Sequence, residues 1–127
     1  KSAIQDQRLA YSASSDGVNW KNFAGNPIID RNMKEFRDPA VFWHAPSNQW
    51  KMVVALSAEW RVLIYGSDDL IHWTELSEFR YGPLAEGVWE CPTMFKMPIE
   101  GTKDTKWVLQ MSINMDPRLH RMVVFVG

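Results

Sequence analysis

The 127-residue sequence predicts an all-β fold built from repeated units of short antiparallel strands, and three observations support this. First, Tyr11 and Trp20 recur as Tyr65 and Trp73, which lie 54 and 53 residues further along the chain. Second, each repeat contains several segments rich in β-branched and aromatic residues, separated by typical turn residues. Third, no extended stretch keeps the apolar period of about 3.6 residues that marks a helix, so helix is predicted to be minor.

The repeat has two further landmarks inside it. The segment Pro39-Ala40-Val41-Phe42 is matched 53 residues later by Pro92-Thr93-Met94-Phe95, and each is followed by a strand that begins with Trp, at Trp50 and Trp107. Four additional residues in the second copy fall in the polar stretch 98–106, where an insertion lengthens a loop and leaves the strands intact. Two unrelated sheets are the alternative, but four landmarks in one order at nearly one spacing favour a true repeat.

The elements follow in order from this period. Residues 8–23 are predicted to be the outer strands of one unit, 36–79 a whole unit, and 89–126 most of the next. Within the whole unit, the four predicted strands are Ala40–His44, Trp50–Ser57, Arg61–Ser67 and Trp73–Phe79. Four antiparallel strands in about 50 residues are typical of a β-propeller blade, and a propeller ring needs at least about four blades. We therefore expect part of a propeller, about two to three blades, whose partners are the remaining blades of the same ring.

The charge and apolar patterns exclude two broad classes of partner. The chain has 14 Lys and Arg against 15 Asp and Glu, so its net charge of -1 provides no basic field for nucleic acid. The longest apolar runs, 52–56 and 122–126, are far shorter than the roughly 20 residues that cross a membrane. The sequence therefore predicts neither a nucleic-acid partner nor a membrane partner.

Cysteine and histidine positions predict no disulfide and no metal centre. The single cysteine, Cys91, cannot form an internal disulfide, and it leaves the cellular compartment open. The three histidines, His44, His72 and His120, are far apart and none has the spacing of a metal-binding motif. We expect no metal and no cofactor. The chain begins at Lys1 without a signal segment, and it is expected to be an internal piece of a longer protein.

Two acidic residues stand just before the prolines of the repeat, in Arg37-Asp38-Pro39 and in Trp89-Glu90-Cys91-Pro92. The first strand of each propeller blade lines the central channel, so Asp38 and Glu90 are expected to enter one pocket from adjacent blades. Two carboxyl groups that converge on one pocket are what glycoside hydrolysis requires. The sequence therefore suggests a glycosidase site.

The neighbours of the two acids suggest different roles for them. Arg37 would keep Asp38 ionised, whereas the apolar neighbours of Glu90 disfavour a charged carboxylate and suit it to be the acid. The alternative is that Arg37 and Asp38 form a local ion pair and that Glu90 is a solvated charge at a strand end. Spacing leaves both interpretations open.

The ordered pair of motifs carries a resemblance. Arg37-Asp38-Pro39 and Glu90-Cys91-Pro92, together with intervening segments such as Asn26-Pro27-Ile28-Ile29 and Trp50-Lys51-Met52-Val53-Val54, resemble glycoside hydrolase family 32. This family contains the β-fructosidases, among them invertases, inulinases and levanases. The resemblance spans nearly the whole chain.

The resemblance implies a five-bladed β-propeller that cleaves terminal β-D-fructofuranosyl residues of sucrose or fructans with retention. It implies that Glu90 is the general acid/base, that Asp38 stabilises the transition state, and that Arg37, Asp38 and Trp89 bind substrate. The family's nucleophile belongs to a Trp-Met-Asn-Asp-Pro-Asn-Gly motif that is absent from this chain. We therefore expect the isolated 127 residues to be inactive.

Several alternatives remain at this point. The protein could be another five-bladed propeller glycosidase, such as an arabinan or xylan hydrolase, or a fructosyltransferase. From a different class, it could be a non-catalytic carbohydrate-binding propeller. The resemblance suggests a secreted or vacuolar protein, or a bacterial cytoplasmic one in sucrose users, and this chain does not choose among them.

Overall fold

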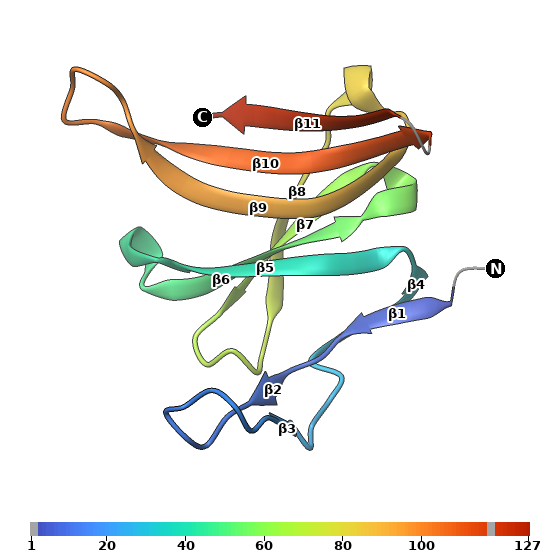
Figure 1. Cartoon of the computed structure of the whole chain (residues 1–127), viewed down its shortest axis with the longest axis vertical. Helices are drawn as coiled ribbons and strands as arrows, with labels where there is room; N and C mark the ends of the chain where they lie inside the picture. The colour runs from blue at the N-terminus through green and yellow to red at the C-terminus, as the bar shows by residue number, and fades with distance from the viewer. Residues whose placement is uncertain (1–2, 117–118) are drawn as a thin grey trace.

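The computed structural model describes residues 3–116 and 119–127, and β-strands dominate this part of the chain (Figure 1). Its helical segments are three short 3-10 turns, namely η1 (Ala45–Ser47), η2 (Ser57–Glu59) and η3 (Gly82–Leu84). The strands form four antiparallel sheets. The predicted all-β fold is confirmed.

Residues 36–79, predicted as one whole unit, form a single four-stranded sheet. Its strands are β5 (Phe36–His44), β6 (Gln49–Leu56), β7 (Arg61–Ser67) and β8 (Thr74–Phe79), paired in this order. β5 begins four residues before the predicted start at Ala40. Arg37 and Asp38 therefore belong to the first strand of the sheet rather than to the loop before it.

The sequence of β6 explains how the sheet is packed. Met52, Val54 and Leu56 point to one face, where they contact the N-terminal part of the chain, whereas Val53 packs on the opposite face. Both sets are almost completely buried. A strand that is covered on both faces reads as a continuous apolar run, which is how 52–56 reads. The sheet is therefore an inner layer between two others.

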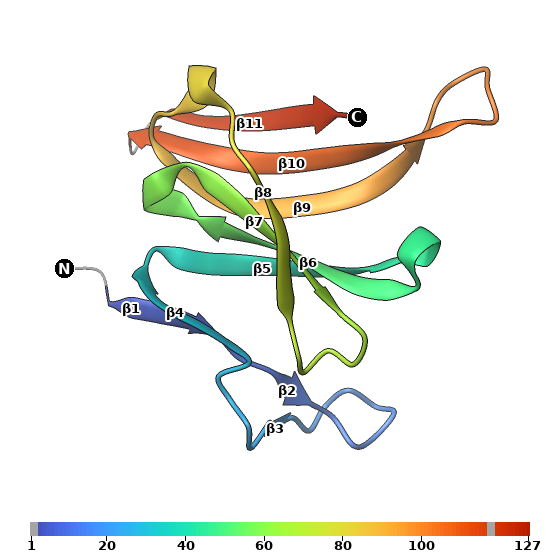
Figure 2. The same cartoon turned by 180° about the vertical axis from the view of Figure 1, so that it is seen from behind.

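The layer on one side is a three-stranded sheet made of β9 (Val88–Pro98), β10 (Thr105–Asp116) and β11 (Leu119–Val126), with β10 in the centre. It lies next to β5 to β8 in both views (Figures 1 and 2). Residues 117 and 118, inside the predicted unit 89–126, are outside the described residues. The insertion that the repeat predicted lies in the long loop between β9 and β10.

The layer on the other side is a long hairpin that is interrupted in the middle. β1 (Ile4–Gln7) pairs with β4 (Ile29–Lys34), and β2 (Ala10–Tyr11) pairs with β3 (Lys21–Asn22). The interruption is bridged by the Asn26 side chain, which accepts a hydrogen bond from Leu9 N (2.8 Å) and donates one to Leu9 O (2.8 Å). The hairpin extends beyond the predicted 8–23 at both ends. The sequence did not predict its outer segments because they are polar and show no apolar alternation.

Two hydrophobic cores hold these layers together, one on each face of the central sheet. The core beneath the hairpin contains Ile29, Phe36, Met52, Val54, Leu56, Leu63 and Tyr65. The core beneath the three-stranded sheet contains Val53, Val62, Trp89, Leu109, Met111 and Ile113. Each contact between neighbouring sheets therefore has its own core, as the packing of successive propeller blades requires.

The first testable prediction concerns the core under the hairpin. Leu63 is completely buried, so Leu63→Ala should lower the free energy of unfolding by about 2–5 kcal/mol through lost contacts and a residual cavity. Leu76 on β8 is 50% exposed, and Leu76→Ala should change the free energy by about 0.5 kcal/mol. Urea unfolding of the two variants measures the difference. Equal effects would contradict the assignment of Leu63 to the core.

Candidate active site

The candidate site lies where β5 and β9, the first strands of two adjacent sheets, run side by side (Figure 1). Arg37 and Asp38 stand at the beginning of β5, and Glu90 and Cys91 stand at the beginning of β9. The two strands start at the same end of the molecule, so these four residues meet there. The structure thus brings the predicted pair Asp38 and Glu90 into one cluster.

Both strands carry the same irregularity at this place. Arg37 pairs with Ala55 but Ala40 pairs with Val53, so β5 has one residue more than its partner in this interval. The same shift occurs on β9 around Cys91 and Pro92, opposite β10. β-bulges of this kind bend a strand and redirect side chains, and they are frequent beside active sites. The bulge therefore gives the cluster its geometry.

The residue in front of each proline has an unusual backbone conformation. Asp38 has φ +59° and Cys91 has φ +49°, in the left-handed region that residues other than glycine rarely adopt. A following proline disfavours helical conformations further. Strain of this kind persists only where the surrounding structure holds it, and it gathers at functional sites. The two blades share this feature at equivalent positions of the repeat.

The cluster is linked across the boundary between the two sheets. Asp38 Oδ2 accepts a hydrogen bond from Cys91 N (3.0 Å), so the main chain of one blade holds a carboxylate of the other. Arg37 Nη2 donates to Glu90 Oε1 (3.2 Å), and Arg37 Nε lies 3.9 Å from Asp38 Oδ2. Arg37 also pairs with Glu35. One guanidinium group therefore connects three carboxylates.

Electrostatics keep Arg37 in its charged form. Partial burial by itself would lower the pKa of the Arg37 guanidinium, but hydrogen bonds and charge attraction from Glu35 and Glu90 outweigh it. The pKa of Arg37 is consequently raised above its ordinary value. The side chains of Arg37, Asp38 and Glu90 remain between 23% and 30% exposed, so a ligand can reach all three.

The surroundings of Glu90 are polar, which differs from the apolar setting expected for it. Its Oε2 accepts a hydrogen bond from the Asn114 amide on β10, and its main-chain oxygen accepts one from Ser112 Oγ (3.2 Å). Neither residue was predicted from the sequence. Their identification requires the register of β9 on β10, which places Ser112 opposite Glu90.

The structure corrects the expectation that Trp89 binds substrate. Its side chain is completely buried in the core between the two sheets, and its Nε1 donates to Leu84 O (3.0 Å). Successive side chains of a strand point to opposite faces, so Trp89 faces the core and Glu90 faces the cluster. Trp89 therefore supports the strand and has no surface to offer a ligand.

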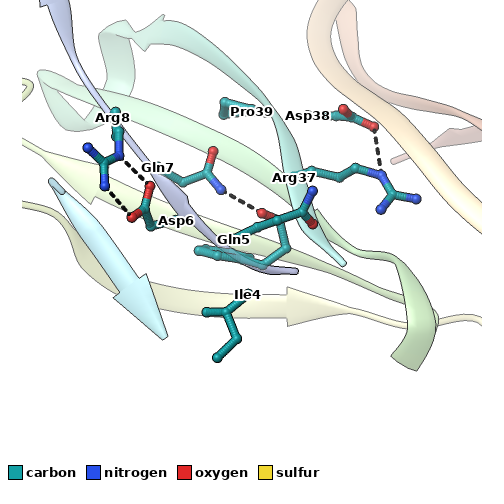
Figure 3. Close-up of a pocket in the computed structure, with 9 residues that line it drawn as sticks. Ile4, Gln5, Asp6, Gln7, Arg8, Arg37, Asp38 and Pro39 are labelled. Atoms are coloured by element: carbon teal, nitrogen blue, oxygen red, sulfur yellow. Dashed lines mark hydrogen bonds and ion pairs between the residues drawn. The ribbon is translucent and has the colours of Figure 1, made fainter. Parts of the chain in front are cut away.

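Two open hollows adjoin Asp38. One of about 500 Å³ lies between β1 and β5, where Arg37 and Asp38 line one wall and residues 4–8, including the paired Asp6 and Arg8, line the other (Figure 3). Another, of about 400 Å³, lies between β5 and β9 and is lined by residues 38–40 and 91–93. Carboxylates and a guanidinium group beside such hollows are suited to bind a ligand rich in hydroxyl groups.

The described residues contain neither a metal site of three or more ligands nor a membrane-crossing helix. No group of three or more His, Cys, Asp or Glu side chains in residues 3–116 and 119–127 is arranged to hold a metal ion. Within the same residues, there is no helix with the length and apolar character needed to cross a membrane.

The second testable prediction concerns the Cys91 thiol, which faces this cluster. Partial burial, together with the negative charges of Asp38 and Glu90, raises the pKa of the thiol above its ordinary value. Because the thiolate is the reactive form, alkylation by iodoacetamide should set in at higher pH than for a free thiol. Asp38→Asn removes one charge and should move the rate profile to lower pH.

A matched control exists on β4. Asp30 also accepts a main-chain hydrogen bond, from Asn32 N (2.7 Å), but it lies on β4, outside the cluster. Asp30→Asn should leave the alkylation profile of Cys91 unchanged. An Asp38→Asn profile identical to that of the control would show that Asp38 has no influence on the thiol.

Comparison with known proteins relates this geometry to characterised enzymes. The invertase of Schizosaccharomyces pombe is 45% identical over 123 residues, which are 95% of this chain and 21% of that protein. The extracellular exo-inulinase of Meyerozyma guilliermondii is 44% identical over 110 residues, 87% of this chain and 21% of that protein. The chain therefore spans about a fifth of the length of these relatives.

Solved structures agree with the sequence comparison. The β-fructofuranosidase from Schwanniomyces occidentalis, complexed with fructosyl-erythritol, superposes with a TM-score of 0.90 at 39% identity, over 98% of this chain and 24% of that one. An exo-inulinase from Aspergillus awamori gives a TM-score of 0.88 at 35% identity, over 98% of this chain and 26% of that one. The sheets described above are thus blades of a five-bladed β-propeller, of which the chain forms part.

The family assignment follows from the whole length of the chain. The model of the glycosyl hydrolases family 32 N-terminal domain matches residues 1–127. The resemblance carried by the Arg-Asp-Pro and Glu-Cys-Pro motifs is therefore confirmed, and the chain belongs to glycoside hydrolase family 32.

Proposed function

We propose that the protein to which this chain belongs is a retaining glycosidase that releases terminal β-D-fructofuranosyl residues from sucrose or a fructan. The observation that carries the proposal is the cluster in which Arg37 joins Asp38 of one blade to Glu90 of the next. The names of the relatives, invertase, exo-inulinase and β-fructofuranosidase, support the same reaction class. Family membership also supports a glycosidase rather than a carbohydrate-binding propeller without activity.

Glu90 has the contacts that a general acid/base needs. Each of its two oxygens receives a hydrogen bond from a fixed donor, one from Arg37 and one from Asn114. In a retaining mechanism, the same carboxyl group protonates the leaving oxygen and later takes a proton from water. These two donors stabilise the carboxylate that remains after Glu90 has transferred its proton to the leaving oxygen.

Asp38 is placed to bind the sugar and not to transfer protons. The N–H of Cys91 fixes its Oδ2, and the carboxylate borders both hollows. A fixed carboxylate can accept hydrogen bonds from ring hydroxyls, and such bonds strengthen as positive charge develops on the sugar. We assign transition-state stabilisation to Asp38 and additional substrate contacts to Arg37.

Retention also requires a nucleophile, the second carboxylate of the displacement. We expect it to come from another blade of the propeller, and we therefore expect the 127 residues on their own not to hydrolyse sucrose or inulin. Hydrolysis and fructosyl transfer share these first steps and differ in the acceptor.

The third testable prediction concerns Glu90 in the complete enzyme. Glu90→Gln keeps the shape of the side chain but removes the transferable proton, so kcat on sucrose should fall by roughly 10²–10⁴ with little change in KM. The control is Glu86→Gln, since Glu86 pairs with Arg121 (3.0 Å) on the surface of the same blade. Steady-state kinetics measure both. Turnover by Glu90→Gln at the level of the control would remove Glu90 from the mechanism.

The fourth testable prediction separates two roles of Asp38. An Asn at this position can still accept the hydrogen bond from Cys91 N, but it lacks the negative charge. If Asp38 stabilises the transition state, Asp38→Asn should lower kcat by roughly 10² or more and leave the thermal midpoint nearly unchanged. If it is only an ion-pair partner of Arg37, at most about 1 kcal/mol of stability is lost and turnover persists. A lowered midpoint with normal turnover would refute the assignment.

A further inference from the structure

A row of polar side chains leads from Glu90 to the edge of the blade. In the register of the sheet, Ser112 of β10 is opposite Glu90 of β9, and Asn114 is opposite His120 of β11. Residues two apart on a strand share a face, so Glu90, Asn114 and His120 lie on one face across three strands. The outermost of them, His120, is exposed.

The hydrogen bonds along this row fix the orientation of the Asn114 amide. Its Nδ2 donates to Glu90 Oε2, and its Oδ1 pairs with His120 Nδ1. An ionised carboxylate can only accept, so the NH₂ group of Asn114 must face Glu90. The carbonyl oxygen then faces His120, and His120 Nδ1 must carry a hydrogen. The two ends of the amide are therefore determined together.

The main chain of Asn114 is held independently of its side chain. A Cβ atom at Gly87 would come within 2.7 Å of Asn114 O, so only glycine allows this close approach of the segment that enters β9. The carbonyl of Gly87 in turn accepts a hydrogen bond from Trp60 Nε1 (3.0 Å), which belongs to the neighbouring blade. The freedom that remains is a flip of the amide about its Cβ–Cγ bond. The hydrogen bonds to Glu90 and to His120 oppose this flip from the two ends of the amide.

We propose that His120 is a positioning residue for the general acid/base and that it acts through Asn114. Without a donor at Nδ1, the amide can turn over and present its carbonyl oxygen to Glu90, where it would repel the ionised carboxylate. With the donor in place, the NH₂ group stabilises the carboxylate that forms when Glu90 protonates the leaving oxygen. His120 thereby favours the proton transfer without touching the substrate.

This inference rests on the proposed function, and it predicts an effect that depends on the leaving group. Sucrose needs protonation of its leaving oxygen, whereas p-nitrophenyl β-D-fructofuranoside has a leaving group that departs without it. kcat/KM reports the steps up to the first bond cleavage. Loss of the His120 donor should therefore reduce kcat/KM for sucrose and spare kcat/KM for the aryl fructoside.

The experiment uses the complete enzyme, its Glu90→Gln variant and three histidine variants. His120→Phe keeps a ring but has no donor, and we expect kcat/KM for sucrose to fall about five- to tenfold, the effect of losing about one hydrogen bond. His120→Asn retains an N–H near the position of Nδ1 and should recover most of the rate. His72→Phe changes an exposed histidine in the loop between β7 and β8 and should have no effect. Thermal midpoints should be equal in all variants.

The outcomes distinguish the two hypotheses. If the unmodified enzyme releases fructose from neither substrate, the proposed function fails. If it is active and Glu90→Gln abolishes sucrose hydrolysis while His120→Phe matches His72→Phe on both substrates, the role of His120 is overturned. An equal loss on both substrates, or a lowered midpoint, would also overturn it, because a merely structural residue gives that result.

A second measurement is independent of activity. The ¹⁵N chemical shifts of the His120 ring should report a hydrogen on Nδ1 at neutral pH, and Asn114→Ala should shift the tautomer toward Nε2. A His120 ring with its hydrogen on Nε2 in the unmodified enzyme would contradict the proposal.

Discussion

The site depends on one cation that is shared across the boundary between two blades. Arg37 contacts Glu35 and Asp38 on its own side and Glu90 on the other, and its raised pKa means that it stays charged. Without it, three carboxylates would stand close together in a partly buried place with no positive charge between them to offset their mutual repulsion. The cation therefore allows the two carboxylates to which we assign different roles, Asp38 and Glu90, to occupy one small region.

This arrangement requires the two blades to be fixed relative to each other. The core around Val53, Val62 and Trp89 provides the apolar contact between them, and the hydrogen bond from Trp60 to Gly87 O adds a polar one at the same end as the site. Trp89 and Glu90 are adjacent in sequence and face opposite ways. The same strand therefore contributes one side chain to the core that positions the blade and another to the proposed acid/base position.

Much of the fold and of the site could be predicted from the sequence, because in a repeat of fixed period each copy indicates where the strands of the other lie. The strands of the central sheet, the convergence of Asp38 and Glu90, and the family all follow from residues that recur or from short motifs. The N-terminal hairpin was predicted too short, since its polar outer segments lack the alternation that marks a strand. Trp89 was assigned to substrate on the resemblance, although strand geometry turns it to the core. The places of Asn114 and His120 beside Glu90 depend on the pairing of β9, β10 and β11, and no local sequence motif indicates them.

The pair of bulges in front of Pro39 and Pro92 has a consequence for how such a site can arise. The two blades have the same backbone irregularity at equivalent positions, but one contributes the side chain of Asp38 and the other contributes the N–H of Cys91 that holds it. A repeated blade brings a second copy of the bulge to the boundary between the two blades, and no new backbone conformation is needed. Different residues at equivalent positions of one repeated backbone therefore make different contributions, and a ring of repeated units can have an asymmetric centre.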